Sequence, residues 1–396
     1  MKVGKNRKII VAMSGGVDSS VAAALLKERG YDVRGVFMRL WKSPNYAEKY
    51  PSALLRAGAE PRGKKDNAEE NTKAVAKKLG IPLKILDFKK EFKKSVVDYF
   101  LKEFACVRTP NPCVVCNQKI KFGLLLDKAL EMGGDYISTG HYARVEPPLS
   151  SLPWKGGKRG EVDFKKNRII KIYHLLMAKD KTKDQSYFLY NLTQEKLKRI
   201  LFPIGDYTKK EVYQMAEKRG LPFQKKESVD ICFLARQDHR EFLNKYLKLK
   251  PGKIVSTNGK ILGEHKGLSL YTIGQRADIG GPGPFYVVRM NLKKNELIVS
   301  NNPRDLMLFG KSLVAENVNW VAGGEPELAL RCRAKIRYGH AAVPVVVDKR
   351  DLVPQKGLSP LKQYFITFQT PQRAITPGQS IVFYQRNEVL GGGVIS

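Results

Sequence analysis

The sequence has few cysteines and no long run of apolar residues. Its 396 residues include only 5 cysteines, a number too small and odd for the disulfide framework of a secreted scaffold. No stretch approaches the roughly 18 apolar residues that a membrane-spanning helix needs. These shortages exclude a disulfide-stapled mini-protein and an integral membrane protein. We therefore expect a cytoplasmic protein whose thiols are catalytic or bind metal.

Acidic residues are also scarce relative to basic ones. Asp and Glu number 38 against 71 Lys and Arg, which gives a formal net charge of +33 at pH 7. An excess of this size favours a polyanionic partner such as nucleic acid, and a general enrichment in lysine is the alternative. Residues 1–8 are basic, but the apolar residues 9–13 follow at once, so we expect no targeting segment.

Strand-like and helical patterns alternate in the first part of the chain. They occupy residues 9–13, 19–29, 33–38, 67–79, 83–86 and 135–139. The alternation predicts an α/β fold with a doubly wound parallel sheet. Two stretches with several prolines and glycines interrupt this pattern. We expect residues 42–66 to be a surface insertion and residues 146–167 to be a loop.

The second half of the chain changes character. Helical spacing over residues 194–219 gives way to irregular residues 221–236 and to short β segments in residues 252–271, which indicate a small central domain. From residue 285 onward, short apolar runs separated by Gly, Pro and Asn predict a C-terminal antiparallel β-barrel. The predicted domains are residues 1–220, 221–284 and 285–396.

Residues 14–20, SGGVDSS, stand between the first predicted strand and the first predicted helix. A parallel sheet binds its ligands at this place. Glycines let the backbone approach a phosphate, hydroxyls donate hydrogen bonds, and the helix N-terminus is positive. The stretch predicts a phosphate cradle, although it has neither the lysine of a P-loop nor the G-x-G-x-x-G of a dinucleotide fold. A simple capped turn is the alternative.

Cys113 and Cys116 form a C-x-x-C pair directly after Pro112. Proline suits the first position of a helix, and a helix N-terminus with nearby cations lowers the pKa of a thiol. We therefore predict two reactive thiols here. A redox pair, half of a metal site and two inert thiols all remain open.

The other three cysteines differ in context. Cys232 lies in the irregular segment, where a loop position favours reactivity. Cys106 and Cys332 have apolar or strand-like neighbours, so we expect both to be buried.

A basic strand face is predicted in the C-terminal region. Arg331, Arg333, Lys335 and Arg337 alternate with smaller or apolar residues, so that one face is entirely basic. Such a face fits a phosphate backbone, and a solvated charged surface is the alternative. Residues 179–185 form a second polar cluster, which is either a solvated loop or an RNA contact.

The motifs, taken together, resemble those of the tRNA-uridine 2-sulfurtransferases (tRNA-specific 2-thiouridylases) of the PP-loop ATP pyrophosphatase superfamily. They are SGGVDSS, RTPNPCVVCNQKIKF, TGHYAR, KDQSYFLY, LFPIG, TIGQR, TPGQS and LGGGVI. The resemblance runs nearly from end to end. It implies an adenine nucleotide alpha hydrolase-like domain, a small central domain and a C-terminal β-barrel, in agreement with the segmentation above.

The resemblance also implies an activity, which is ATP-dependent 2-thiolation of the wobble uridine of tRNA. In that mechanism ATP and Mg²⁺ serve to adenylate the uridine O2. A persulfide on Cys232 then delivers sulfur to C2, and Cys116 assists release by forming a disulfide. The implied partners are wobble-uridine tRNAs, resembling those for Lys, Glu and Gln, and either a persulfide sulfur-relay donor or free sulfide.

Site residues follow from the matching motifs. The resemblance places ATP on Ala12, Met13, Ser14, Gly15, Gly16, Val17, Asp18 and Ser19, with Met38 and Gly140 nearby. It places the target base against Asn111, Pro112 and Cys113. It assigns tRNA contacts to His141, Lys183, Asp184, Gln185, Arg337, Tyr338 and Gln379.

One position departs from the family pattern. The family has Asp where this chain has Cys113, so either Cys113 replaces that carboxylate or the mechanism differs. Cys113, Cys116 and Cys232 could instead hold a 4Fe-4S cluster whose open iron binds sulfide. A structural zinc would need a fourth ligand, for which His141 is the candidate. Two other functions stay open: a tRNA-binding module with a structural metal and a degenerate nucleotide site, and another adenylating PP-loop enzyme.

Overall fold

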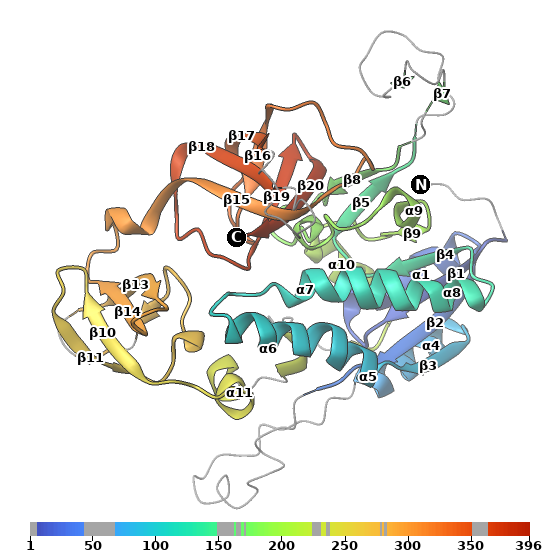
Figure 1. Ribbon diagram of the computed structural model, residues 1–396. Helices are drawn as coiled ribbons and strands as arrows, with labels where there is room; N and C mark the ends of the chain where they lie inside the picture. The colour runs from blue at the N-terminus through green and yellow to red at the C-terminus, as the bar shows by residue number, and fades with distance from the viewer. Residues whose placement is uncertain are drawn as a thin grey trace, which may run out of the picture.

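The computed structural model describes residues 6–42, 68–148, 172–223, 238–277, 283–350 and 363–396, with the short stretches 162–163, 168–169, 231–234 and 279–280. Figure 1 shows an α/β part, a small β-rich part in yellow and orange, and a C-terminal barrel in red. This architecture confirms the predicted fold class.

The N-terminal sheet has five parallel strands in the order β3-β2-β1-β4-β9. They are β1 (Lys8–Met13), β2 (Asp32–Arg39), β3 (Leu83–Asp87), β4 (Tyr136–Thr139) and β9 (Ile200–Leu201). The order places β1 at the centre, so the chain that leaves β1 enters the middle of the sheet's carboxyl edge. The predicted strands at residues 9–13, 33–38, 83–86 and 135–139 are confirmed.

Helices cover both faces of this sheet, because β1 is apolar on both sides. Ile9 and Val11 belong to one buried cluster, and Ile10 belongs to another. The first face is covered by α1 (Val17–Glu28), α4 (Ala68–Leu79) and α10 (Lys209–Lys218). The second is covered by α5 (Lys89–Phe92), η1 (Lys93–Val97), α6 (Asp98–Ala105), α7 (Pro112–Val115), η2 (Cys116–Leu124) and α8 (Leu125–Glu131).

The continuous helical spacing expected over residues 194–219 needs correction. The segment forms α9 (Gln194–Leu197), then strand β9, and then α10. Ile200 and Leu201 pair with Ile137 and Ser138 of β4. The apolar run at Ile200–Leu201 is short enough to fit either a helix or a buried strand. It forms a strand because it pairs with the edge of β4.

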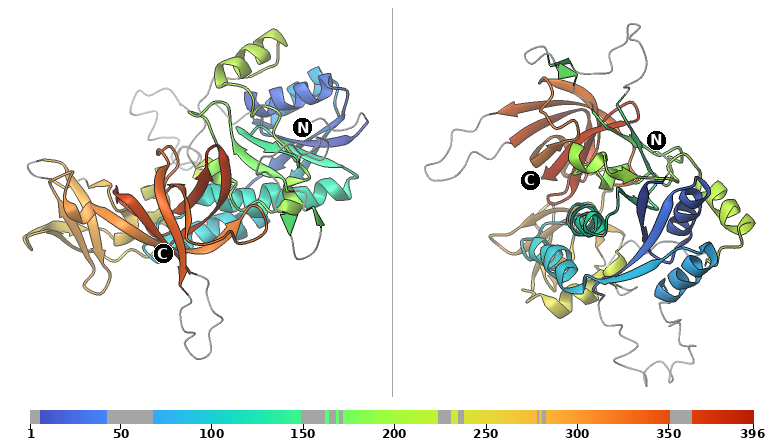
Figure 2. Two further views of the ribbon diagram at one scale, coloured as in Figure 1. Left: turned by 90° about the horizontal axis from the view of Figure 1, so that it is seen from above. Right: turned by 90° about the vertical axis from the view of Figure 1, so that its right-hand side faces the viewer.

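Segments α7, η2 and α8 join into one helical rod, residues 112–131. Its middle, η2, is π-helical, which is a wide form that occurs often at functional sites. In the right-hand view of Figure 2, the helices of this face lie between the blue sheet and the red barrel. The rod therefore lies between the parallel sheet and the barrel.

The central part contains a second five-stranded sheet in the order β11-β10-β14-β13-β12. Its elements are α11 (His239–Tyr246), β10 (Gly252–Ser256), β11 (Ile261–His265), η5 (Leu268–Leu270), β12 (Arg276–Ala277), β13 (Phe285–Asn291) and β14 (Glu296–Ser300). The sheet thus passes the predicted boundary at residue 285. We correct this boundary to the segment after Ser300, because β14 pairs with both β10 and β13.

Six antiparallel strands close into the C-terminal barrel. They are β15 (Phe309–Trp320), β16 (Leu330–Lys335), β17 (Val343–Arg350), β18 (Gln363–Arg373), β19 (Ser380–Gln385) and β20 (Glu388–Ile395), preceded by η6 (Leu306–Leu308). Pairing of β15 with β20 completes the circle. The strands β5 (Ala143–Glu146) and β8 (His174–Met177) extend this sheet beyond β20, so the α/β part and the barrel share hydrogen bonds.

The expected insertion at residues 42–66 and most of the loop at residues 146–167 lie outside the described residues. Within the latter, β6 (Val162–Asp163) pairs with β7 (Arg168–Ile169). In the described part of the chain, the helices are all too short or too polar to cross a bilayer.

Candidate active site

The loop of residues 14–20 is compact and joins β1 to α1. Its Ser14 N–H donates to Ser19 Oγ at 3.1 Å, and Ser19 Oγ donates to Gly16 O at 3.1 Å. Gly15 has φ +78°, and a Cβ there would lie 2.3 Å from the carbonyl oxygen of Ala68 in α4. Both the backbone angle and the close approach require glycine. The loop therefore leaves a hollow of backbone groups in front of α1.

The strand order brings the other expected nucleotide residues to this hollow. Met38 is half-buried at the end of β2, and Gly140 follows β4, the two neighbours of β1. A Cβ on Gly140 would lie 2.6 Å from Ser19 N and 2.7 Å from the carbonyl carbon of Asp18. This geometry fits an adenine nucleotide, whose phosphates would meet the start of α1.

Asp18 makes two contacts that the motif alone does not predict. Lys209 Nζ donates to its two carboxylate oxygens at 2.7 and 2.8 Å, and the Tyr142 hydroxyl donates to Oδ1 at 2.8 Å. Burial and the Asp18 charge raise the pKa of Tyr142, so Tyr142 remains a donor. A carboxylate is the ligand type that Mg²⁺ prefers. Asp18 fits that role once it separates from Lys209.

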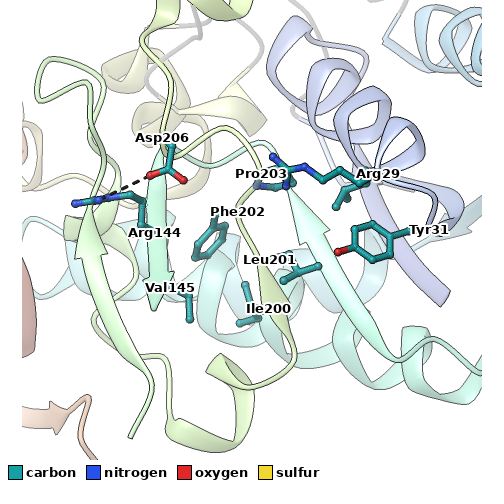
Figure 3. Close-up of a pocket in the computed structure, with 10 residues that line it drawn as sticks. Arg29, Tyr31, Arg144, Val145, Ile200, Leu201, Phe202, Pro203 and Asp206 are labelled. Carbon is teal, nitrogen blue, oxygen red and sulfur yellow. Dashed lines mark ion pairs between the residues drawn. The ribbon is translucent and has the colours of Figure 1, made fainter. Parts of the chain in front are cut away.

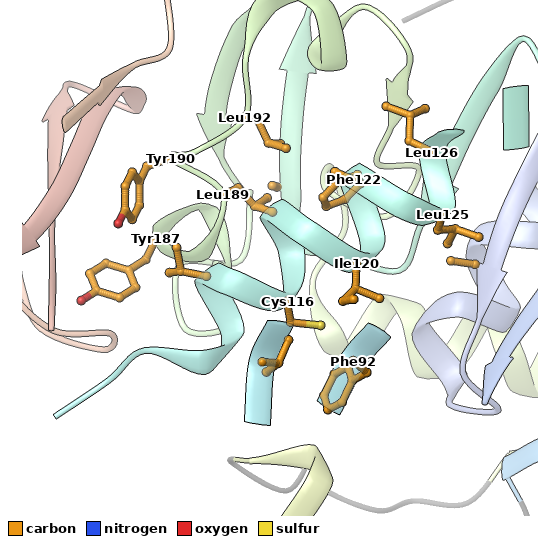
Figure 4. Packing of buried hydrophobic residues seen from close by; sticks show 14 of the residues in the cluster. Phe92, Cys116, Ile120, Phe122, Leu125, Leu126, Tyr187, Leu189, Tyr190 and Leu192 are labelled. Carbon is orange, nitrogen blue, oxygen red and sulfur yellow. The ribbon is translucent and has the colours of Figure 1, made fainter. Parts of the chain in front are cut away.

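Cys113 and Cys116 lie on the first turns of the rod. Cys113 is half-buried, whereas Cys116 packs in the same buried cluster as Phe92 and Ile120 (Figure 4). Burial raises the pKa of Cys116 to about 12. The expectation of a lowered pKa for this thiol is therefore wrong, because desolvation outweighs the helix terminus.

Cys232 lies in the short turn η4 (Cys232–Leu234) and is exposed, in agreement with the prediction of a loop thiol. Its neighbour Phe233 anchors the turn among the rings of Phe92, Phe100 and Phe242, at centroid distances of 5.9, 5.3 and 5.8 Å. The protein around the sulfur raises the pKa of Cys232, and Lys121 and Lys42 oppose this rise.

The two cysteines expected to be buried differ from each other. Cys332 is half-buried on β16, and burial raises its pKa to about 12. Cys106 is exposed instead, because it caps the end of α6 and its side chain leaves the apolar face of that helix.

His141 is buried, and its expected tRNA contact remains a prediction. Its ring lies 5.7 Å from the Phe122 ring and 5.9 Å from the Phe202 ring. Its Nδ1 is 2.7 Å from Thr139 Oγ1, and its Nε2 is 3.4 Å from Lys121 Nζ. Burial, with the charge of Lys121, holds the pKa of His141 well below its usual value.

Gln379 and Arg337 also bind the protein itself. Gln379 Nε2 donates to the carbonyls of Thr109 and Pro110 at 3.1 and 3.3 Å, and it thereby holds the segment in front of the rod. Arg337 Nη2 donates to three oxygens at 2.6 to 3.1 Å, one of them Thr376 Oγ1. In the structure these two side chains hold neighbouring segments of the protein together through these hydrogen bonds. Their expected tRNA contacts remain predictions.

The expected base-facing residues divide in a similar way. Asn111 and Pro112 are buried. Cys113 keeps part of its surface exposed. Cys113 is therefore the member of this set that is best placed to meet a base.

Residues 183–185 are also mixed. Lys183 is exposed, but buried Asp184 accepts from Ala178 N at 2.9 Å and from Ser186 Oγ at 2.9 Å. Gln185 Oε1 accepts from Tyr142 N at 2.9 Å. An RNA contact by Asp184 or Gln185 would break one of these side-chain hydrogen bonds, whereas a contact by Lys183 would break none of them.

Tyr338 is exposed and lies against Phe188, which ends η3 (Ser186–Phe188) and belongs to the motif KDQSYFLY, although it was not among the predicted site residues. The ring centroids are 4.6 Å apart. On β16, Arg331 and Arg333 are exposed and Lys335 is half-buried. The predicted basic strand face is present only in part, because Arg337 lies beyond β16 and its side chain binds protein oxygens. Aromatic rings beside cations are the combination that binds unpaired nucleotides.

The three reactive-thiol candidates do not form a metal site in the structure. Among the described residues, no three His, Cys, Asp or Glu side chains come together in an arrangement that holds a metal ion. The hypotheses of a cluster on Cys113, Cys116 and Cys232 and of a zinc with His141 are therefore not supported. We derive no step through either group.

A cavity of about 120 Å³ lies near the far end of α1. Leu26, Arg29, Tyr31, Arg144 and Asp206 are among its lining residues, and Arg144 Nη1 is 3.7 Å from Asp206 Oδ1 (Figure 3). Leu26 is nine residues beyond Val17, or about 13 Å along the helix axis. The cavity is therefore separate from the nucleotide hollow.

Comparison with known proteins gives matches over the whole chain. Family models match for the tRNA methyl transferase HUP domain at residues 7–236, the tRNA methyl transferase PRC-barrel domain at residues 240–301, and the aminomethyltransferase beta-barrel domain at residues 310–395. The last two ranges agree with the corrected boundary after Ser300.

Full-length relatives carry one description. The tRNA-specific 2-thiouridylase MnmA of Legionella pneumophila is 41% identical over 396 residues, covering 98% of each chain. The protein of the same description from Carboxydothermus hydrogenoformans is 41% identical, over 100% of this chain and 99% of its own. That from Roseiflexus castenholzii is 42% identical, over 98% of this chain and 99% of its own.

Proposed function

Because the chain belongs to the tRNA-specific 2-thiouridylase family, we propose that it catalyses the ATP-dependent 2-thiolation of a tRNA uridine. The observation that carries this proposal is the identity of about 40% over the full length of the relatives. The proposed substrate is the wobble uridine of tRNAs resembling those for Lys, Glu and Gln, and the proposed compartment is the cytoplasm.

The first proposed step activates the base at the loop of residues 14–20. The uridine O2 attacks the α-phosphorus of ATP, an O–P bond forms, and pyrophosphate leaves with the electrons of the broken bond. Backbone groups at the start of α1 face the phosphates, and Lys209 is within reach of the same charge. When held by Asp18, Mg²⁺ would neutralise the leaving pyrophosphate.

The second proposed step transfers sulfur from Cys232. The terminal sulfur of a Cys232 persulfide attacks C2, the C2–S bond forms, and AMP leaves with the electrons of the C2–O bond. The Cys116 thiolate then attacks the inner sulfur. The S–S bond to the base breaks, its electron pair goes to the base sulfur, and Cys116 and Cys232 become a disulfide. A thiol reductant resets the enzyme, and a persulfide donor reloads Cys232.

Cys113 has no assigned step in this scheme. Its thiol is partly exposed, at the position where the family has a carboxylate. We propose that it contacts the target base in place of that carboxylate.

The function is tested with purified protein, tRNA, ATP, Mg²⁺ and a low-molecular-weight persulfide. Mass spectrometry of the digested tRNA measures 2-thiouridine, and a coupled assay measures pyrophosphate. We expect ATP-dependent 2-thiouridine from the natural protein.

Two variants separate the two steps. Asp18→Ala should abolish pyrophosphate release while tRNA affinity stays within a few fold. Cys232→Ser should stop thiolation and keep some pyrophosphate release. Tight tRNA binding with no pyrophosphate release would instead indicate a tRNA-binding module.

A further inference from the structure

One lysine joins the two halves of the proposed active site. Lys121 Nζ lies 3.4 Å from His141 Nε2, and His141 directly follows Gly140, which packs against the start of α1. On its other side, Lys121 belongs to η2, the segment that begins with Cys116. Lys121 is therefore on the same helical segment as Cys116, and its ammonium group contacts the residue that follows Gly140.

The π-helical form of η2 brings residues 116 and 121 closer to one face than an α-helix would. In an α-helix, residue 121 would point about 140° away from residue 116, toward nearly the opposite face. A π-helix instead relates residue i to residue i+5, and the Leu125 N–H donates to Ile120 O, five residues back. A wider turn leaves a smaller angle between residues 116 and 121 than an α-helix does, and η2 also has a kink at Phe122 (φ -108°, ψ 15°).

Buried His141 holds the ammonium group in place. The neutral ring leaves Nε2 as an acceptor for Lys121, while Nδ1–H donates to Thr139 Oγ1 at 2.7 Å. Phe122 and Phe202 fix the ring on its sides. Lys121 is thus half-buried and directed, in contrast to its exposed neighbour Lys119.

The charge of Lys121 reaches both sulfurs. At Cys116 and at Cys232 it is the largest of the influences that oppose the effect of burial on the thiol pKa. Lys42 adds a second positive charge at Cys232.

We propose that Lys121 is a catalytic residue of the sulfur-transfer step and that His141 is its positioning residue. This inference rests on the proposed function. The negative charge of the terminal persulfide sulfur passes to the phosphate of AMP when the C2–S bond forms and the C2–O bond breaks. An ammonium group fixed at this place attracts the anionic sulfur and stabilises the charge as it moves.

The first test needs neither tRNA nor ATP. The protein is alkylated with iodoacetate, which is anionic, or with iodoacetamide, which is neutral, and tryptic peptide 227–236 reports Cys232 alone. Both reagents consume the same thiolate, so the ratio of their rates measures the local attraction for anions. We expect Lys121→Met to lower this ratio on the order of fivefold, and Lys121→Arg to restore most of it.

Two further variants control this measurement. Lys119→Met changes an exposed lysine of the same segment and should leave the ratio unchanged. Lys42→Met removes the second cation, and the Lys121→Met effect should persist in that background. An unchanged ratio in Lys121→Met would overturn the inference, whether or not the proposed function holds.

The second test separates the two chemical steps in the full chain with tRNA. We expect Lys121→Met to lower sulfur transfer on the order of 10²-fold while pyrophosphate release stays within a few fold. His141→Gln keeps an acceptor near the position of Nε2 and should retain most of the transfer, whereas His141→Leu should lose it. Equal loss of both steps in a folded Lys121→Met protein, or full transfer, would contradict the assignment.

Discussion

At the scale of single residues, the nucleotide loop depends on a partner that its motif does not contain. The sequence predicted Asp18 from its place between a strand and a helix. It could not predict Lys209, which lies 191 residues further along the chain, because that contact exists only when α10 packs against α1. The same holds for Lys121, since the wide turn of η2 is not encoded by any simple spacing.

We expect Lys209→Met to lower tRNA-dependent pyrophosphate release on the order of 10²-fold, because it removes the ammonium group nearest to Asp18. Lys210→Met is the matched control, since Lys210 is the next residue of α10 and is exposed. A pyrophosphate assay on both variants makes the comparison. Equal rates in the two variants would rule out a role for Lys209 in adenylation.

Cys116 should be nearly unreactive in the free protein. Its pKa of about 12 leaves little thiolate at pH 8, so we expect its alkylation to be on the order of 10³-fold slower than that of exposed Cys106. The rate should rise about tenfold per pH unit toward pH 12. The thiol of Cys116 ionises near pH 8.5 in the unfolded chain but stays neutral in the folded protein. The free energy of unfolding therefore falls as the pH rises above about 8.5. Comparable rates at pH 8 would contradict this account.

At the scale of elements, the capped start of α10 determines where Lys209 lies. Thr208 caps α10 through a capping box: its Oγ1 accepts from Glu211 N at 3.2 Å, and the Glu211 carboxylate accepts from Thr208 N at 2.5 Å. The box fixes the first turn, which carries Lys209. The contact of this turn with Asp18 could not be predicted from the sequence, because it depends on the packing of α10 against α1.

Thr208→Ala should reduce hydrogen-exchange protection of the α10 amides by roughly fivefold, which corresponds to about 1 kcal/mol for a lost cap. Thr193→Ala is the matched control, since Thr193 precedes α9 without a side-chain cap. Hydrogen bonds from Thr208 and Lys179 lower the pKa of Glu211 to about 2. The ionised carboxylate of Glu211 therefore adds to the free energy of unfolding above about pH 4.5, and this contribution is lost as the pH falls toward 2. Equal protection in both variants would argue against the cap.

At the scale of the whole molecule, the barrel holds the segment in front of the rod. Thr109 N–H donates to Pro377 O at 2.9 Å, and Gln379 donates to Thr109 O. The order of the three parts was predicted correctly from the sequence, and the basic strand of the barrel was predicted in part. It placed the central boundary too early, because β13 is a short alternating strand that resembles the barrel strands and the pairing with β14 is not visible locally.

Gly378→Ala should impair sulfur transfer more than it impairs tRNA binding. A Cβ on Gly378 would lie 2.8 Å from Thr109 O and push the segment that leads to Cys113 away from the barrel. Gly339→Ala is the control, since Gly339 also has a positive φ, of +80°, but no atom within 4 Å of the added Cβ. Thiolation rates and tRNA affinities of both variants separate steric displacement from backbone strain. Similar losses in the two variants would contradict the claim that the barrel holds the segment at Thr109 in place for sulfur transfer.

The central claim is that Cys232 carries the sulfur that reaches tRNA. Its most direct test is a single turnover with protein whose persulfide is labelled with a heavy sulfur isotope and freed of excess donor. We predict that the label appears in 2-thiouridine only when ATP is present, with at most one label per chain, and that Cys232→Ser transfers none. Label transfer by Cys232→Ser, or transfer without ATP, would contradict the account.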